Sequence, residues 1–167
     1  MTSLHRITTE YSEAEDRLRL AGEDAHGQTV VLWLTQRLLG RLLPHLCQWL
    51  EQQGGNAPMA EVRQEFAQLK ARADLAPQPP VRAGADVQGV LIHAVELNAT
   101  HAGMGLQFKD MGGHMVASLH LQPLPLRQWL NIVFDQYLKA QWPTAVWPQW
   151  VADAQPPQTP ARTAMLH

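Results

Sequence analysis

The stretch Thr29-Val30-Val31-Leu32-Trp33-Leu34-Thr35 runs straight into a long amphipathic segment, and this junction predicts a buried strand followed by a helix. The strand is rich in β-branched residues and is apolar enough to be buried on both faces. Thr35 is a suitable N-cap for the helix, and Pro44 inside the helix predicts a kink or a restart. The apolar residues of the helix recur with the α-helical period: Leu38, Leu39, Leu42, Leu43, Leu46, Trp49 and Leu50.

Two further strands precede this junction. Residues Leu4–Tyr11 mix β-branched and aromatic residues with polar ones, as a half-exposed strand does. Residues Arg17–Ala21 alternate between arginine and leucine, and Gly22–Gly27 has the composition of a turn. Together with the buried strand they predict a three-stranded antiparallel meander.

A similar pattern follows after a second helix and a linker. The second helix is more polar and covers Pro58–Arg72, and the linker at Leu75–Asp86 is rich in proline. One stripe of the helix carries Met59, Val62, Phe66 and Leu69. The second meander and its helix are predicted at Val90–Leu97, Met104–Lys109, His114–Leu121 and Leu126–Ala140.

The sequence therefore predicts an α+β fold with two antiparallel three-stranded β-meanders, each followed by an amphipathic helix. A helix pair is inserted between the meanders, and a Trp/Pro-rich tail ends the chain. We expect one domain over residues 1–140, with half-repeats at about 1–53 and 88–140 joined by the helix and linker at 54–87, and a partly disordered tail at 141–167. An offset of 88 residues aligns Leu4-His5-Arg6-Ile7 with Ile92-His93-Ala94-Val95, so an internal duplication is one interpretation. The alternative is that two meanders followed by helices look alike because their periods are alike.

The composition limits the class of protein. The chain has 167 residues, of which 46% are hydrophobic, and a net charge of -2 at pH 7, which is typical of a folded domain and gives no sign of phosphate-backbone binding. The single cysteine, Cys47, excludes an internal disulfide and a zinc site built on paired thiolates. The N-terminus lacks the apolar core of a signal peptide, and no apolar run is long enough to span a membrane. We therefore expect a cytoplasmic protein with no membrane partner, and its ten arginines against three lysines are typical of a GC-rich bacterial genome.

No catalytic motif is present in the sequence. There is no phosphate loop, dinucleotide fingerprint, nucleophile elbow or paired-histidine metalloprotease helix. The pairs Gly54-Gly55 and Gly112-Gly113 lack a following Lys-Ser/Thr and are typical of turns. We expect no enzymatic activity and no cofactor.

One predicted hairpin, Thr100–His120, gathers imidazole and thioether side chains. Such soft ligands favour monovalent copper when a fold brings them together, although their spacing matches no recognised metal motif. A metal or small-ligand site is thus a weaker alternative, and its ligands would be His101, Met104, Met111, His114 and Met115.

Three tryptophans lie among prolines after the last predicted helix. Each carries about 200 Å² of surface that is costly to leave in water. They can fold back and complete the core of their own chain, or they can dock into a partner, because tryptophan is enriched in binding hot spots. The candidate partner-binding residues are Trp142, Trp147 and Trp150.

A second candidate surface is basic. Arg17 and Arg19 occupy alternate positions of one strand, and Arg6 lies on the strand before it, so the three can share one sheet face. This face is the basis of an alternative function, the binding of single-stranded nucleic acid, which salt should weaken steeply.

The order of elements from Leu4 to Ala140 resembles the head domains of the scaffold superfamily that includes end-joining repair scaffolds and the centriolar cartwheel protein. That resemblance implies a small β-sandwich, with a helix pair after its third strand, that forms dimers. A duplicated meander followed by a helix also resembles Pur- and Whirly-type single-strand-binding proteins, which have four strands per repeat and a basic sheet studded with aromatic residues. Here the sequence predicts three strands per half, and the pI near 6.4 argues against basic character.

The function that these observations favour is a non-enzymatic protein-interaction module. It would be an adaptor, scaffold or accessory subunit of a larger bacterial complex, or a homodimer, and it would bind through an exposed sheet face, the tryptophan tail or both.

Overall fold

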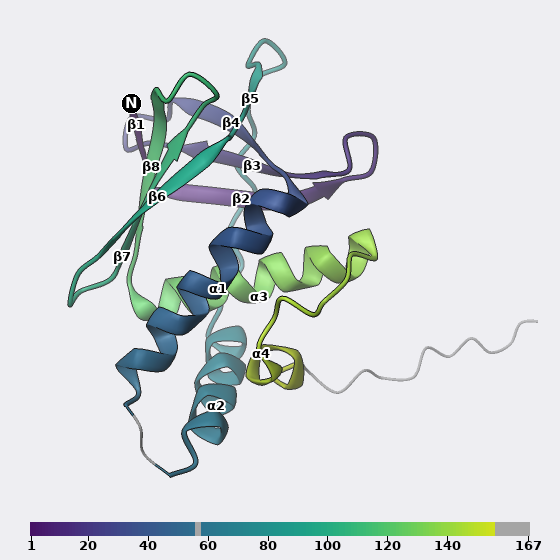
Figure 1. Cartoon of the computed structure of the whole chain (residues 1–167). Coiled ribbons are helices and arrows are strands. Elements are labelled where there is room, and N and C mark those ends of the chain that lie inside the picture. Colours follow the sequence, from purple (N-terminus) through teal and green to yellow (C-terminus); the bar gives the residue numbers. More distant parts are fainter. Residues whose placement is uncertain (56–57, 156–167) are drawn as a thin grey trace, which may run out of the picture.

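The structure, a computed structural model, describes residues 1–55 and 58–155. These residues form two four-stranded sheets and four helices (Figure 1). One sheet has the order β2-β3-β4-β5, and the other has the order β1-β8-β7-β6. The strands are β1 (Thr2–Leu4), β2 (Arg6–Ser12), β3 (Arg17–Glu23), β4 (Thr29–Leu34), β5 (Gly89–Leu91), β6 (Ala94–Ala99), β7 (Met104–Lys109) and β8 (Met115–Leu121). The helices are α1 (Gln36–Gln53), α2 (Ala60–Ala73), α3 (Pro123–Ala140) and α4 (Gln149–Asp153). The mixed α+β class predicted from the sequence is confirmed.

Two short strands tie the sheets together. β1 pairs in parallel with β8 at the register Ser3↔Ser118, and β5 pairs in parallel with β4 at the register Leu32↔Val90. The first strand of each half therefore joins the sheet formed by the other half. The prediction of three strands per half was wrong, because strands of three residues are too short to show an alternating pattern.

The predicted strand Val90–Leu97 is in fact two strands. The chain bends at Ile92 and His93, so that β5 lies in one sheet and β6 in the other. Each half consequently has four strands and then a long helix in the same order. A common origin of the two halves stays a prediction.

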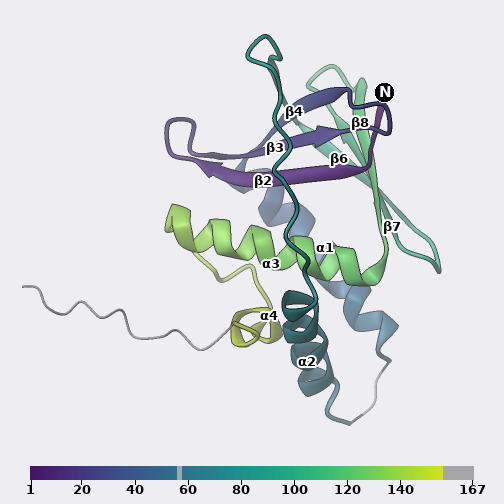
Figure 2. The same cartoon turned by 180° about the vertical axis from the view of Figure 1, so that it is seen from behind.

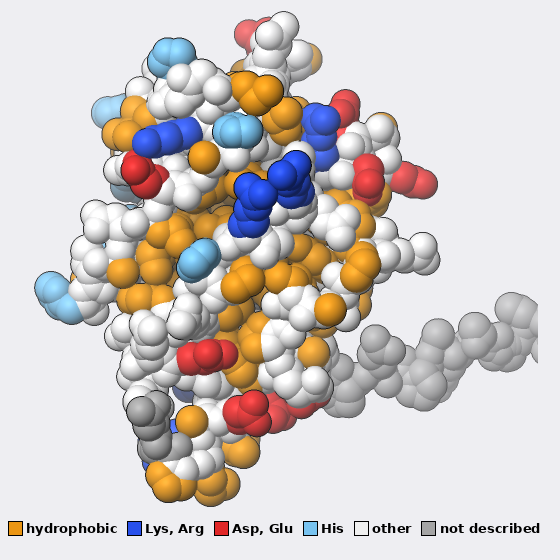
Figure 3. Space-filling model, in the orientation of Figure 1, with side chains coloured by type: hydrophobic (Ala, Val, Ile, Leu, Met, Phe, Trp, Pro, Cys, Tyr) orange, Lys and Arg blue, Asp and Glu red, His pale blue; other side chains and the backbone are white. Residues whose placement is uncertain are grey.

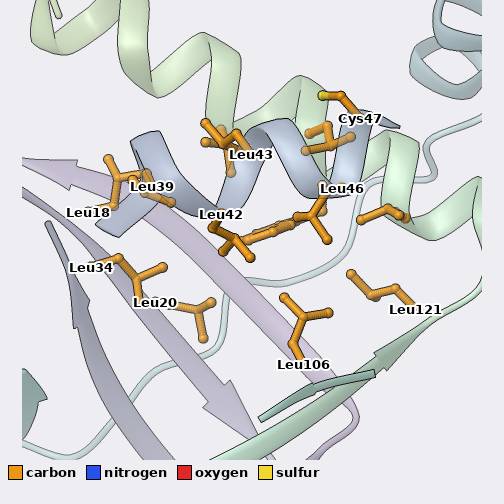
Figure 4. Packing of buried hydrophobic residues seen from close by; sticks show 14 of the residues in the cluster. Leu18, Leu20, Leu34, Leu39, Leu42, Leu43, Leu46, Cys47, Leu106 and Leu121 are labelled. Atoms are coloured by element: carbon orange, nitrogen blue, oxygen red, sulfur yellow. The ribbon is translucent and has the colours of Figure 1, made fainter. Parts of the chain in front are cut away.

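Helix α1 inserts its leucine face into the core between the sheets (Figure 4). Leu39, Leu43 and Leu46 are fully buried with leucines of both sheets, among them Leu20 and Leu106. Burying a leucine side chain is worth about 1.5–3 kcal/mol, so this face alone is a large part of the stabilisation.

The start of α1 is as predicted from the sequence, whereas its middle differs from the prediction. The backbone N–H of Leu38 donates to Thr35 Oγ1 at 3.1 Å, so the predicted N-cap is confirmed. The predicted restart at Pro44 is wrong, because the helix runs through it without a break. Pro44 and Gly40 are both exposed, so water can hydrogen-bond the Gly40 carbonyl that Pro44 leaves without a donor.

The proline-rich segment between α2 and β5 has no helix or strand, as predicted, but it is packed onto the protein. It crosses the outer face of the β2–β3 pair (Figure 2). Val81 is buried, and its backbone N–H donates to Thr8 Oγ1 at 2.8 Å, while Arg6 Nη1 donates to the Pro79 carbonyl at 2.6 Å. The segment is therefore a strap that covers part of a sheet.

The three tail tryptophans are buried in the core of their own chain. Trp147 packs edge to face on Phe134 and Tyr137 of α3, and Trp142 Nε1 donates to Asp16 Oδ1 at 3.0 Å. That hydrogen bond is the main reason why the pKa of the Asp16 carboxyl lies below its usual value. Of the two roles that the sequence left open for these residues, the structure displays the intramolecular one.

The rest of the predicted tail divides into two parts. Residues 149–153 form α4, and Ala154 is buried. The remainder of the predicted disordered stretch, from residue 156 onwards, lies outside the described residues. None of the four helices in the described ranges has the length and apolarity needed to cross a bilayer.

We predict that Trp150→Ala lowers the free energy of unfolding by about 3–5 kcal/mol, because the side chain is only 4% exposed and its removal leaves a cavity. Chemical denaturation monitored by circular dichroism measures the change. The control is Leu124→Ala, which removes a side chain that is 45% exposed and should cost no more than about 0.5 kcal/mol. Equal stability of Trp150→Ala and the native chain would show that the tail does not contribute to the core.

Candidate functional site

A groove runs between helix α1 and strand β6, two elements that contact each other. Two adjoining cavities of about 220 and 190 Å³ form it, and they share Leu38, Arg41 and His93 as lining residues. In Figure 3 hydrophobic side chains line the surface between α1 and β6, and a group of cationic side chains lies beside them over α1. The apolar wall of the groove consists of Leu38, Leu42, Leu91, Ile92, Val95 and Leu97.

The cationic rim of the groove follows from the geometry of α1. Arg37, Arg41 and His45 are four residues apart, so they lie along one side of the helix. The leucines at neighbouring positions are buried, which leaves these three side chains exposed. No ion pair or hydrogen bond joins Arg37 or Arg41 to another residue in the described ranges, and no acidic residue is among those that line the cavities.

The far side of the groove is the free edge of a sheet. The backbone N–H of Thr100 donates to the Gly103 carbonyl at 2.9 Å, which identifies the hydrogen-bonded pairs of the β6–β7 ladder. Because such pairs alternate along antiparallel strands, every second residue of β6 points its backbone groups at β7. The residues that do so are Ala94, Glu96 and Asn98.

The remaining residues of β6 point their N–H and C=O groups away from the sheet. No strand in the described part of the chain pairs with that side of β6, which is the last strand of its sheet. Unpaired backbone groups on a sheet edge are a template for a further strand. The residues that present them are Val95, Leu97 and Ala99.

The groove is better suited to an extended chain than to a compact ligand. Sites for small organic molecules usually enclose about 300–1,000 Å³, and each of the two cavities is smaller than that. An apolar floor, a row of unpaired backbone groups and a cationic rim are the features that an extended peptide with acidic side chains can use together.

The proposed metal ligands are separated in the structure. His101 lies in the turn between β6 and β7, whereas Met111 and His114 lie in the turn at the other end of β7. Met104 is buried in β7, and Met115 begins β8. A six-residue strand is about 20 Å long, so one ion cannot reach both turns. No group of three or more His, Cys, Asp or Glu side chains in the described ranges is arranged to hold a metal.

The three arginines of the proposed nucleic-acid surface are each close to a carboxylate. Arg6 Nε lies 2.7 Å from Glu23 Oε1, Arg19 Nη1 lies 3.5 Å from Glu10 Oε1, and Arg17 Nη1 lies 3.7 Å from Glu15 Oε2. The three therefore share a region of one sheet, as the sequence suggested, but their charge is largely balanced by neighbours.

Cys47 is a buried free thiol. It is 3% exposed on the inner face of α1, and burial raises the pKa of its thiol to about 12. The thiolate is the reactive form of cysteine, so the folded protein holds this residue inert.

We predict that a thiol reagent such as a disulfide dye does not label the native protein at pH 8 but labels one thiol per chain after unfolding in guanidinium chloride. Absorbance of the released dye measures the reaction. Fast labelling of the native chain would show that the core around α1 opens readily.

Comparison with protein-family models, with curated proteins and with solved structures gives no significant match.

The groove was not among the sites predicted from the sequence. The spacing of Arg37, Arg41 and His45, on the side of the helix away from the leucines, was the only available signal. Cations on the exposed side of an amphipathic helix are ordinary, and the free edge of β6 became visible only when the topology of the sheets was known.

Proposed function

We propose that this chain is a non-enzymatic protein-interaction module that binds an extended, acidic segment of a partner in the groove between α1 and β6. The observation that carries the proposal is the free edge of β6 beside an apolar groove with two arginines that have no partner in the described ranges. Such a module would act as an adaptor or accessory subunit of a bacterial cytoplasmic complex.

In this proposal the partner segment adds a strand to the sheet. Its backbone hydrogen-bonds the outward N–H and C=O groups of Val95, Leu97 and Ala99, which supplies affinity without regard to sequence. Side chains alternate along a strand, so every second residue of the segment enters the groove, where small apolar groups fit the leucine wall.

The arginines supply selectivity for acidic side chains. Arg37 and Arg41 are exposed and lie one helical turn apart, and a guanidinium pairs well with a carboxylate because it can donate two parallel hydrogen bonds. A lysine-rich segment would meet like charge at the same rim and be rejected.

We predict that a ten-residue peptide with Val and Glu in turn at every second position and Ser between them, the Glu–Val peptide, binds the native protein and that its lysine counterpart does not. Residues two apart lie on the same side of a strand, so both Val and Glu face the groove and its arginines. Because both cations of the rim become anions, Arg37→Glu combined with Arg41→Glu should weaken binding of the Glu–Val peptide by about a hundredfold at an ionic strength of about 0.1 M. Isothermal titration calorimetry measures both affinities.

The matched control is Arg82→Glu, which changes the same charge at an exposed residue outside the groove. It should leave the affinity within about twofold, because exposed charges beyond a Debye length of about 10 Å are screened. A Glu–Val peptide with N-methylated backbone amides should also fail to bind, since it cannot form the ladder. Equal binding of the N-methylated peptide would exclude strand addition.

One observation favours a second candidate function, the binding of single-stranded nucleic acid. Each half of the chain has four strands followed by a helix, which is the number that the resemblance to Pur- and Whirly-type proteins implies. On the outer face of the first sheet, Arg19 pairs in register with the half-buried Trp33, an arrangement on which a base could stack.

For this second function we expect a single-stranded oligonucleotide to bind at low salt and to be released steeply as salt rises. Arg19→Ala should weaken the binding, whereas Arg82→Ala should not. Fluorescence anisotropy of a labelled oligonucleotide measures the affinity. The probe has twenty nucleotides, which is about the length of one to several binding sites. A flat anisotropy signal at low salt would rule this function out.

A further inference from the structure

Helix α2 packs its polar side against the rest of the protein and turns its apolar side toward solvent. Its buried residues are Gln64, Gln68 and Ala71. Phe66 is 68% exposed, Leu69 is 40% exposed and Val62 is 38% exposed, although all three are large apolar side chains. An amphipathic helix in a soluble protein normally has the opposite orientation.

The polar contacts of α2 show that this orientation is built in. Gln68 Nε2 donates to Asn131 Oδ1 of α3 at 2.8 Å, and Asn131 Nδ2 donates back to the Gln68 carbonyl at 3.2 Å. Arg72 makes two hydrogen bonds of 3.0 Å to the Asp135 carboxylate. Turning the helix over would leave these buried amides without partners, which is costly.

The outward apolar residues have the spacing of a helix-pairing seam. They are separated by four, three and four residues, which is the heptad pattern of positions a and d. In the described ranges α2 contacts α3 and α4, and it contacts α1 through the hydrogen bond from Gln64 Nε2 to the Leu50 carbonyl. The exposure of Val62, Phe66 and Leu69 shows that none of these helices covers the seam. The residues of the seam are Val62, Phe66, Leu69 and Ala73.

We infer that the α2 seam pairs with the α2 seam of a second copy of this chain, parallel and around a two-fold axis. A helix of about two heptads is too short to pair stably as a free peptide. Here α2 is already held in place by α3, so little conformational entropy remains to be lost when two copies meet. The small contact area implies a dimer of micromolar affinity.

The charges beside the seam favour this occupant and this direction. Glu65 occupies position g and Lys70 occupies position e of the next turn, and these two positions face each other across a parallel pair. Lys70 Nζ also lies 2.9 Å from Asp74 Oδ2 of its own chain, but this pair is exposed and leaves the ammonium open to a second carboxylate. Two-fold symmetry forms the Glu65–Lys70 pair twice.

In an antiparallel pair Arg63 would instead face Lys70, which is a like-charge contact. Glu65 would then face Arg72, whose guanidinium is already held by the Asp135 carboxylate.

Sedimentation equilibrium of the full chain tests the dimer. We expect a monomer–dimer equilibrium that Phe66→Glu weakens by about a hundredfold, since it places two carboxylates in the apolar seam. The control is Met111→Glu, which makes the same kind of change at a residue that is 77% exposed in the β7–β8 turn. A full chain that stays monomeric at the highest attainable concentration, or a dimer that Phe66→Glu leaves intact, would overturn the inference.

Charge exchange tests the direction of the pair. Glu65→Lys alone should weaken the dimer, and the double variant Glu65→Lys with Lys70→Glu should restore it, because the facing charges are again opposite. Failure of the double variant to recover would overturn the parallel pair. A chain ending at Gln155 must dimerise like the full chain; if only the shortened chain dimerised, the C-terminal residues would be the occupant instead.

Discussion

The packing of the α1 leucine face against both sheets is the interaction on which the rest of the structure depends. The sheets are joined by the short parallel strands β1 and β5, and α1 fills the space between them with fully buried leucines. Because this side of the helix points inward, Arg37 and Arg41 must point outward. The same packing places α1 beside β6, whose outer edge pairs with no strand in the described ranges. The core and the groove therefore both follow from the packing of α1.

Helix α2 illustrates a different balance of forces. Its contact with α3 is polar, and burial lowers the pKa of Arg127, whose guanidinium is hydrogen-bonded to Gln64 and Gln68 at 2.5 and 3.2 Å. Hydrogen bonds of this kind add little net stability but specify one orientation, since any other leaves buried groups unsatisfied. The orientation leaves the apolar seam of α2 in solvent, so burying the seam against a second helix would lower the free energy.

Part of the fold could be predicted from the sequence because it rests on local patterns. The alternation of Arg17-Leu18-Arg19-Leu20 indicated β3, the leucine period indicated α1, and Thr35 marked the start of that helix. The exchange of β1 and β5 between the sheets could not be predicted, because pairing partners far apart in the chain leave no periodic signal in strands of three residues.

The candidate site and the packing of the tail were harder to predict from the sequence than the strands and helices. The tryptophans of the tail attracted attention as partner-binding residues, but an exposed and a buried tryptophan look the same in a sequence, and the structure uses Trp142, Trp147 and Trp150 to complete the core. The seam of α2 was visible as a stripe. That it faces solvent depends on Gln68 and Asn131, residues 63 positions apart whose amides meet only in the folded chain.

The central claim is that the outward edge of β6 accepts a strand, and amide hydrogen exchange of β6 followed by NMR tests it most directly. In the free protein the outward amides of Val95, Leu97 and Ala99 should exchange much faster than the inward amides of Ala94, Glu96 and Asn98, which are bonded to β7. Adding the Glu–Val peptide should slow the three outward amides selectively. Peptide binding that leaves the outward amides as fast as before would contradict the account.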